Sequence, residues 1–147
     1  MIKLIVSDVD GTLVPEGTND LNPEIFTHIR RLKAQGIYFA IASGRHKCSI
    51  EKLFAPVKED IFYITSNGAY TGTCHKKLAV SALPDHVRQK LFSDLDALNP
   101  YPYMAESIDA AYTACPDPEF IRILNEDYGY DMSPCASMAD IKDVLIQ

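Results

Sequence analysis

Three uninterrupted apolar runs, separated by amphipathic segments, dominate the first half of the chain. The runs occupy residues 4–6, 37–42 and 61–65. Runs of this kind are typical of strands buried on both faces of a parallel sheet. The first amphipathic segment carries Ile25 and Ile29 at helical spacing. Strand, helix, strand, helix, strand with short links predicts a Rossmann-like parallel α/β sheet.

The pattern changes after residue 67. Residues 69–83 resemble a hairpin with its turn near residues 72–75, and Pro84 with Asp85 is typical of a helix start. Two short strands, residues 101–107 and 110–115, and a helix from Asp117 to Gly129 are expected to follow. We therefore predict two domains, a core of residues 1–83 and a smaller α/β module of residues 84–147.

Composition excludes several classes of protein. The 147 residues are 47% hydrophobic, enough for a core, and the net charge of -6 disfavours a nucleic-acid partner. No apolar run reaches the length of a membrane span. The cysteines show no CxxC pair, which predicts reduced thiols in a cytoplasmic protein. The histidines show no metal-site spacing and are predicted to be solvated. These residues are Cys48, Cys74, Cys115 and Cys135, and His28, His46, His75 and His86.

Polar residues follow each predicted strand of the core. Asp8 and Asp10 come after the first, Ser43 after the second, and Ser66 with Asn67 after the third. In open sheets of this class, ligands bind at the carboxyl ends of the strands. The sequence therefore predicts that these residues meet at one site.

The spacing of Asp8 and Asp10 indicates phosphoryl chemistry. Residues two apart on an extended backbone face the same side, and two such carboxylates repel unless a cation joins them. Mg2+ prefers oxygen ligands, and beside it one carboxylate can attack phosphorus while the other transfers a proton. A helix-loop-helix calcium loop starting at Asp8 is excluded, since its glycine and glutamate positions hold Leu13 and Asn19.

Three motifs carry a resemblance to a known family. "DVDGTL" at 8–13, "IASGR" at 41–45 and "ITSNGA" at 64–69 resemble the haloacid dehalogenase-like phosphatases, in particular the Cof-type subfamily. This resemblance implies a core with an inserted α+β cap domain. It also implies that Asp8 is the nucleophile, that Asp10 is the general acid and base, and that both help to hold Mg2+.

The resemblance also implies a set of residues around the phosphate and substrate. Its members are Val9 through its amide, Thr12, Ser43, Gly44, Arg45 and Asn67. Arg45 has two possible interpretations: it contacts the substrate or the cap, or it is an ordinary surface residue. Asn67 also has two: it helps to shape the pocket, or it only forms the turn. Tyr101, Tyr103 and Tyr112 either line a cap pocket or belong to its core.

Two parts of the family pattern are missing from the sequence. These are a lysine on a later helix and a "GDxxND"-like acidic segment. The final residues, "DVLIQ", are expected to begin a further cap strand, and the chain is therefore predicted to be truncated within the cap. Loss of later strands beside the first one would expose a sheet edge, so we also expect self-association there.

The function predicted from these observations is that of a magnesium-dependent phosphatase. It would hydrolyse a small phosphorylated metabolite, such as a sugar phosphate, through a phosphoaspartate. Two alternatives stay open, a phosphosugar mutase on the same scaffold and a truncated, non-catalytic fragment.

Overall fold

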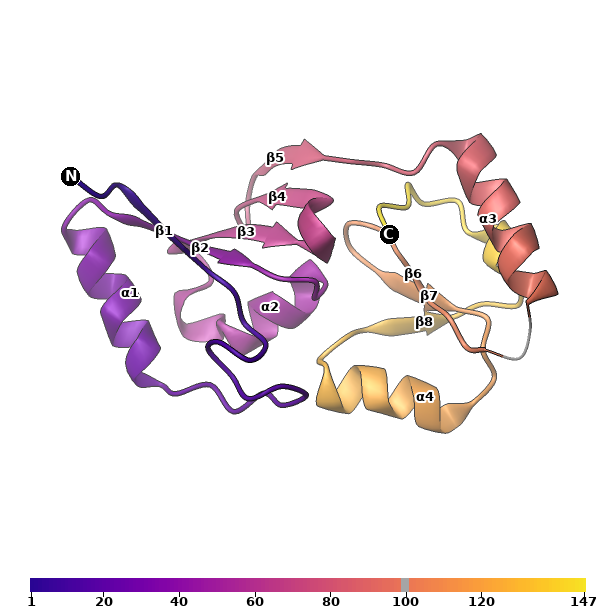
Figure 1. The fold of residues 1–147 in the computed structure, drawn as a ribbon, viewed down its shortest axis with the longest axis horizontal. Coiled ribbons are helices and arrows are strands. Elements are labelled where there is room, and N and C mark those ends of the chain that lie inside the picture. The colour runs from indigo at the N-terminus through magenta and orange to yellow at the C-terminus, as the bar shows by residue number, and fades with distance from the viewer. Residues whose placement is uncertain (99–100) are drawn as a thin grey trace.

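The computed structural model describes residues 1–98 and 101–147, which form two β-sheets (Figure 1). The first sheet has the order β1 (Leu4–Ser7), β2 (Tyr38–Ala42), β3 (Ile61–Thr65), β4 (Tyr70–Gly72) and β5 (Lys77–Val80). The second has the order β6 (Ala105–Glu106), β7 (Ala111–Thr113) and β8 (Met132–Pro134).

The first three strands form the predicted Rossmann-like core. β1 pairs with β2 and β2 pairs with β3, both in parallel, and α1 (Glu24–Ala34) and α2 (Lys47–Leu53) make the crossovers. A short 3-10 helix, Ala55–Val57, precedes β3. β4 and β5 continue the sheet as antiparallel strands. The expected fold class and the expected hairpin are therefore confirmed.

The ends of α1 follow from local chemistry. Asn22 Oδ1 accepts a hydrogen bond from the amide of Glu24 at 3.0 Å and so satisfies one of the free donors of the first turn. Gly36 adopts a φ of 72°, which ends the helix in the left-handed region that glycine enters most easily.

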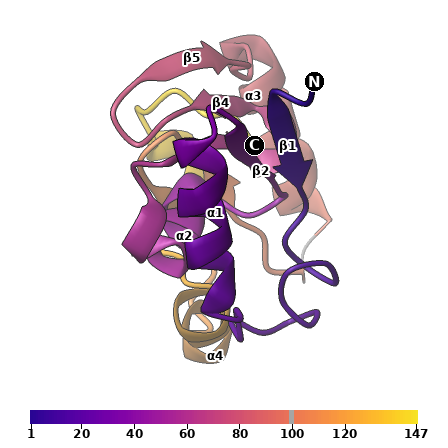
Figure 2. The ribbon, with the colours of Figure 1, turned by 90° about the vertical axis from the view of Figure 1, so that its left-hand side faces the viewer.

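The first strand is not buried as its sequence predicts. Leu4 and Val6 are each 49% exposed, and Tyr38, opposite Leu4 on β2, is 61% exposed. Figure 2 shows α1 and α2 together on one side of β1 and β2. Ile5 packs against the core cluster beneath these helices. β1 therefore ends the sheet, and the face that carries Leu4 and Val6 is open to water.

The second half of the chain surrounds the smaller sheet. α3 (Asp85–Ala97) precedes it, and α4 (Pro118–Arg122) continues as a π-helix, Ile123–Asp127, before Gly129. Asp117 Oδ1 caps α4 by accepting from the amide of Glu119, as expected. A 3-10 helix, Met138–Asp140, precedes the last residues.

The final residues do not form the expected strand. Leu145 forms an isolated antiparallel bridge with Ser107, and the amide of Ile146 donates to the Glu106 carbonyl at 2.8 Å, so these residues lie beside β6 without forming a regular strand. Across residues 1–98 and 101–147, no helix combines the length and the apolar character that a membrane crossing requires.

Candidate active site

The loop after β1 turns tightly around Val9. The Val9 carbonyl accepts hydrogen bonds from the amides of Leu13 and Val14, at 2.8 and 3.0 Å. Gly11, with a φ of 74°, permits this turn. Because the Val9 side chain is completely buried, its neighbours Asp8 and Asp10 are directed away from the core.

Asp8 and Asp10 lie in different surroundings. Asp8 is exposed, and its carboxylate lies 3.5 Å from the hydroxyl of Thr12. Asp10 is half-buried and is held by Arg45, whose Nη2 and Nε atoms donate to it at 2.7 and 3.0 Å. The exposed carboxylate is free to meet a ligand, whereas the other is already neutralised.

Arg45 is a buried residue, only 4% exposed, and the surface interpretation of it is therefore wrong. Besides Asp10, it donates to Asn19 Oδ1 at 2.5 Å and to the Thr18 carbonyl at 2.7 Å. Its guanidinium also lies 5.7 Å from the centre of the Tyr128 ring, in the second half of the chain. Arg45 thus connects the loop after β1, the loop before α1 and Tyr128, the residue directly after the π-helix Ile123–Asp127.

Backbone contacts join the ends of β2 and β3. The amide of Ser66 donates to the Arg45 carbonyl at 3.0 Å, and the amide of Asn67 donates to the Ser43 carbonyl at 3.3 Å. Ser43 Oγ accepts from the Arg45 amide at 3.1 Å. A Cβ on Gly44 would lie 3.0 Å from Asn67 Oδ1, so a larger residue would crowd that side chain.

The turn after β3 has an unusual backbone. Ser66, Asn67 and Gly68 have φ values of 50°, 52° and 88° in succession. Non-glycine residues in this region are strained, and such strain gathers at functional sites. The Asn67 side chain is exposed and donates to Gln147 Oε1 at 3.1 Å, so Asn67 both forms the turn and reaches the second half.

His46 contradicts the prediction that the histidines are solvated, because its side chain is completely buried. It caps α2, with Nδ1 accepting from the Cys48 amide at 3.3 Å, and its Nε2 lies 2.8 Å from the Ser107 carbonyl. Burial lowers the pKa of His46, but contacts with Cys48 and Ser107 and the charge of Glu106 raise it above its ordinary value. The only feature of the sequence that pointed to a buried His46 was its position between the "SGR" motif and the predicted helix.

Further contacts between the two halves are mostly polar. They are Asn19 Nδ2 to the Asp127 carbonyl at 2.7 Å, Ser49 Oγ to the Tyr128 carbonyl, and Lys52 Nζ to the Tyr130 carbonyl at 3.2 Å. Glu106 joins Ser66 and Tyr130 at the same boundary. Glu106 and Tyr130 were not predicted as site residues, since neither lies in a motif.

The model of the haloacid dehalogenase-like hydrolases matches residues 5–142. The chain belongs to this family. The chain is similar to a protein of Buchnera aphidicola subsp. Baizongia pistaciae that is named as a phosphatase. The two are 35% identical over 101 residues, which are 65% of this chain and 34% of that protein.

Solved structures of haloacid dehalogenase-like hydrolases share the fold. A Eubacterium rectale protein superposes with a TM-score of 0.82 and 32% identity, over 97% of this chain and 55% of its own. The HAD subclass IIB sugar phosphatase BT4131 superposes with a TM-score of 0.75 and 24% identity, over 97% of this chain and 56% of its own. The chain thus spans about a third to a half of the length of these relatives.

The fit of this hydrolase chain to Mg2+, the metal that the superfamily generally uses, is partial. The oxygen ligands that Mg2+ prefers are present in Asp8 and Asp10. However, the Asp10 carboxylate is already ion-paired with Arg45. Within residues 1–98 and 101–147, no three acidic, histidine or cysteine side chains are grouped to hold a metal. Of these two carboxylates, Asp8 is the one that forms no ion pair within the described residues.

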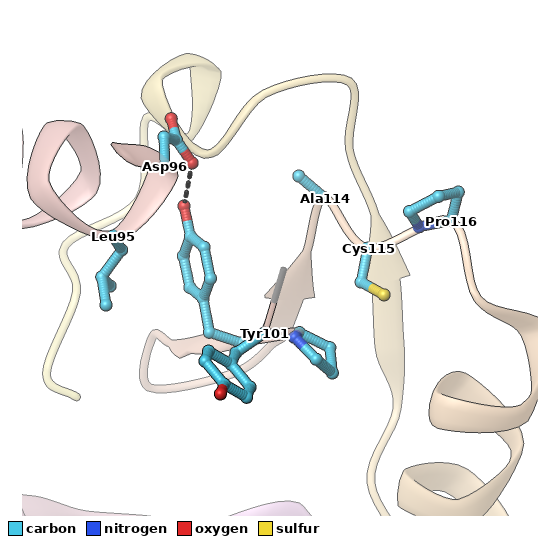
Figure 3. A pocket seen from close by; sticks show the side chains of 8 residues that line it. Leu95, Asp96, Tyr101, Ala114, Cys115 and Pro116 are labelled. Atoms are coloured by element: carbon cyan, nitrogen blue, oxygen red, sulfur yellow. Dashed lines mark hydrogen bonds between the residues drawn. The ribbon is translucent and has the colours of Figure 1, made fainter. Parts of the chain in front are cut away.

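The predicted cap tyrosines contribute to a cavity outside the loops of Asp8 and Asp10. A cavity of about 310 Å³ is lined by Leu95, Asp96, Tyr101, Pro102, Tyr103, Ala114, Cys115 and Pro116 (Figure 3). The Tyr103 hydroxyl donates to Asp96 at 2.6 Å. Tyr112 is not part of this lining, and its hydroxyl donates to Asp143.

Proposed function

We propose that this chain carries the nucleophile half of a phosphomonoesterase site, acting on a small phosphorylated metabolite. The observation that supports this most is the contrast between the two aspartates. Asp8 is exposed beside Thr12, whereas Asp10 is ion-paired with a buried arginine. An exposed carboxylate suits a nucleophile, and a carboxyl that is held in place suits a proton carrier.

The proposed reaction has two steps. A carboxylate oxygen of Asp8 attacks phosphorus and forms a phosphoaspartate as the ester P–O bond breaks. Asp10, which enters this step in its protonated form and so without its charge pairing to Arg45, gives its proton to the leaving oxygen. A water molecule then attacks phosphorus, gives its proton to Asp10, and releases phosphate from Asp8. Each aspartate returns to its starting state, so the cycle requires only water.

The remaining predicted residues suit the role of holding the phosphate. The Ser43 hydroxyl accepts from the Arg45 amide, which leaves its own hydrogen for a phosphate oxygen. Thr12 lies beside Asp8, and the Val9 amide and Gly44 belong to the adjoining loops. Arg45 and Asn67 complete this set at the ends of β2 and β3.

Mg2+ belongs to this proposal as the ion that neutralises charge on the phosphate and on Asp8. Asp8 and Asp10 are the residues that would hold it. The same proposal places the phosphatase in the cytoplasm and divides it at residues 83 and 84, into the core of residues 1–83 and the cap of residues 84–147.

Hydrolysis of para-nitrophenyl phosphate tests the proposal, with and without Mg2+, in the wild type, in Asp8→Asn and in the matched control Asp20→Asn. Asp20 is an exposed acid in the neighbouring loop. We expect metal-dependent turnover in the wild type and control, and none in Asp8→Asn. Equal activity in all three proteins would exclude Asp8 as the nucleophile, and no turnover in any would favour the non-catalytic alternative.

A further inference from the structure

Cys48 and His46 bring a thiol and an imidazole together at the start of α2. The Cys48 Sγ atom lies 2.9 Å from His46 Nδ1. His46 is completely buried, whereas Cys48 remains partly exposed to solvent. The proposed phosphatase reaction gives neither side chain a role. A nucleophilic side chain in contact with a base is an arrangement that activates the nucleophile.

The other ring nitrogen of His46 fixes the direction of this contact. Nε2 lies 2.8 Å from the Ser107 carbonyl, which can only accept a hydrogen bond. Nε2 therefore carries a hydrogen, and in the neutral ring Nδ1 is then an acceptor. The Cys48 amide donates to Nδ1 at 3.3 Å, which agrees with this assignment. The imidazole thus presents a lone pair to the Cys48 thiol.

The surroundings of His46 favour the uptake of a proton. Burial alone would lower its pKa, but contacts with Cys48 and Ser107 and the charge of Glu106 raise it above its ordinary value. Tyr130 stacks on the imidazole with ring centres 6.1 Å apart, and burial and Glu106 raise the pKa of this tyrosine, so its hydroxyl stays neutral. The groups around the ring therefore support a proton on both of its nitrogens.

The helix cap alone does not account for the contact between thiol and imidazole. His46 caps α2 by accepting from the backbone amide of residue 48, a bond that any residue except proline would supply. The sulfur adds nothing to that bond. It nevertheless lies closer to Nδ1 than the amide nitrogen does, at 2.9 against 3.3 Å. The contact of the thiol is therefore a feature separate from the cap.

Cys48 differs from the other cysteines in its partner and not in its exposure. All four cysteines are partly buried. Burial raises the pKa of the Cys74 and Cys135 thiols, which makes them less reactive, and Cys135 Sγ meets Met138 Sδ at 3.6 Å. In the part of the chain that the structure describes, Cys48 is the one thiol that contacts a histidine nitrogen. Its environment is thus the one that favours reaction.

We propose that Cys48 is a site of reversible oxidation by hydroperoxides, with His46 as the base. As the sulfur attacks one peroxide oxygen, the thiol proton passes to His46 Nδ1. The O–O bond breaks, and the departing oxygen takes that proton and leaves as water or as an alcohol. The new S–O bond makes Cys48 a sulfenic acid, so the sulfur is oxidised and the peroxide is reduced. A small thiol can reverse this change.

Peroxide labelling of the full chain tests the proposal. The protein is treated with hydrogen peroxide and dimedone, which traps sulfenic acids, and the label on each cysteine is followed by mass spectrometry. We expect Cys48 to be labelled about tenfold faster than Cys115 in the folded protein. In urea the two should react at similar rates, because unfolding separates Cys48 from an imidazole held by Ser107.

Two variants identify the base. His46→Asn keeps a side chain that can cap α2 but removes the imidazole, so labelling of Cys48 should slow about tenfold while that of Cys115 stays unchanged. The matched control is His28→Asn, which removes an exposed histidine and should behave as wild type. Circular dichroism shows whether each variant is folded.

The outcomes decide between a reactive thiol and an ordinary one. The proposal is overturned if Cys48 and Cys115 of the folded wild type are labelled at the same rate. It is also overturned if folded His46→Asn keeps the wild-type rate at Cys48. If His46→Asn does not fold, the comparison of the wild type with and without urea decides, and an advantage of Cys48 that persists in urea would exclude the folded pair as its cause.

Discussion

Arg45 places a positive charge against Asp10 from a position that is almost closed to water. Its Nη2 atom lies 2.7 Å from the carboxylate. Two unit charges about 4 Å apart interact by about 4 kcal/mol near a protein surface. A cation that approaches Asp10 must therefore overcome repulsion from Arg45 and compete with it for the carboxylate.

Removal of this charge should strengthen metal binding. We expect Arg45→Gln to bind Mg2+ about tenfold more tightly than the wild type, whose affinity should be millimolar or weaker. Calorimetry measures both values. The matched control is Lys52→Gln, because Lys52 is an exposed cation paired with Asp131. If the wild type binds Mg2+ tightly, or if Arg45→Gln binds it no more tightly than the wild type does, then Arg45 does not oppose metal binding at Asp10.

Buried tyrosines should make the protein sensitive to alkali. Burial raises the pKa of Tyr63 far above its ordinary value of 10.0, and its hydroxyl donates to the Lys58 carbonyl at 2.8 Å. The hydroxyl ionises in the unfolded chain above pH 10.0 but stays neutral in the fold. Its contribution to stability is therefore complete below this pH and is lost as the pH rises further.

Urea unfolding at about pH 9 and about pH 11 checks this expectation. The free energy of unfolding should fall across this interval in the wild type, and it should fall less in Tyr63→Phe. Tyr38→Phe is the control, because Tyr38 is 61% exposed. An identical fall in Tyr63→Phe and Tyr38→Phe would show that Tyr63 is not responsible.

At the scale of elements, the turn between β3 and β4 depends on backbone conformation more than on contacts. Gly68 has a φ of 88°, and a Cβ added there would meet nothing within 4 Å. Gly68→Ala should therefore destabilise the fold through strain alone, by about 1 kcal/mol. Asn67→Gly should change stability much less, since glycine adopts the φ of 52° freely. Comparison of their urea midpoints tests this, and equal losses would indicate that side-chain contacts matter more.

For the whole molecule, the open face of the first sheet is the feature most prone to association with other chains. Ile2, Leu4, Val6 and Tyr38 are exposed and apolar, and β1 ends the sheet with an unpaired edge. Parallel sheets usually have both faces covered, and exposed edges pair with other chains. We expect this chain to self-associate through β1.

Sedimentation at increasing concentration measures this association. The wild type should sediment faster than a 16.4 kDa monomer, and Val6→Lys should restore the monomer. Val87→Lys is the control, because Val87 is 40% exposed on α3, outside the first sheet. A compact wild-type monomer at all concentrations would contradict the expectation.

The sequence predicted local structure well where one segment carries its own signals. β3 occupies residues Ile61–Thr65, as its apolar run and following turn indicate. Asn22 and Gly36 also mark the surroundings of α1 correctly. The rule that the carboxyl ends of parallel strands meet at one edge predicted that the residues after β2 and β3 lie together, and the Asn67 amide does donate to the Ser43 carbonyl. The contact of Arg45 with Asp10 did not follow from this rule.

Features that depend on distant partners were not predictable. The apolar run of β1 is the same whether or not a layer covers it, so its exposure depends on the rest of the molecule. His46 is buried because its ring meets Ser107, which lies 61 residues further along the chain. Glu106 lies on a strand of two residues, too short for any periodic pattern.

The covalent connection between the two sheets has a consequence for the contacts across their boundary. All strands of the first sheet precede residue 81, all strands of the second follow residue 104, and α3 begins at Asp85. The tether is therefore only residues 81–84. Short tethers keep two partners at an effective concentration in the millimolar range. Contacts too weak to join separate molecules thus suffice to keep these halves closed, and the same weakness permits rapid release.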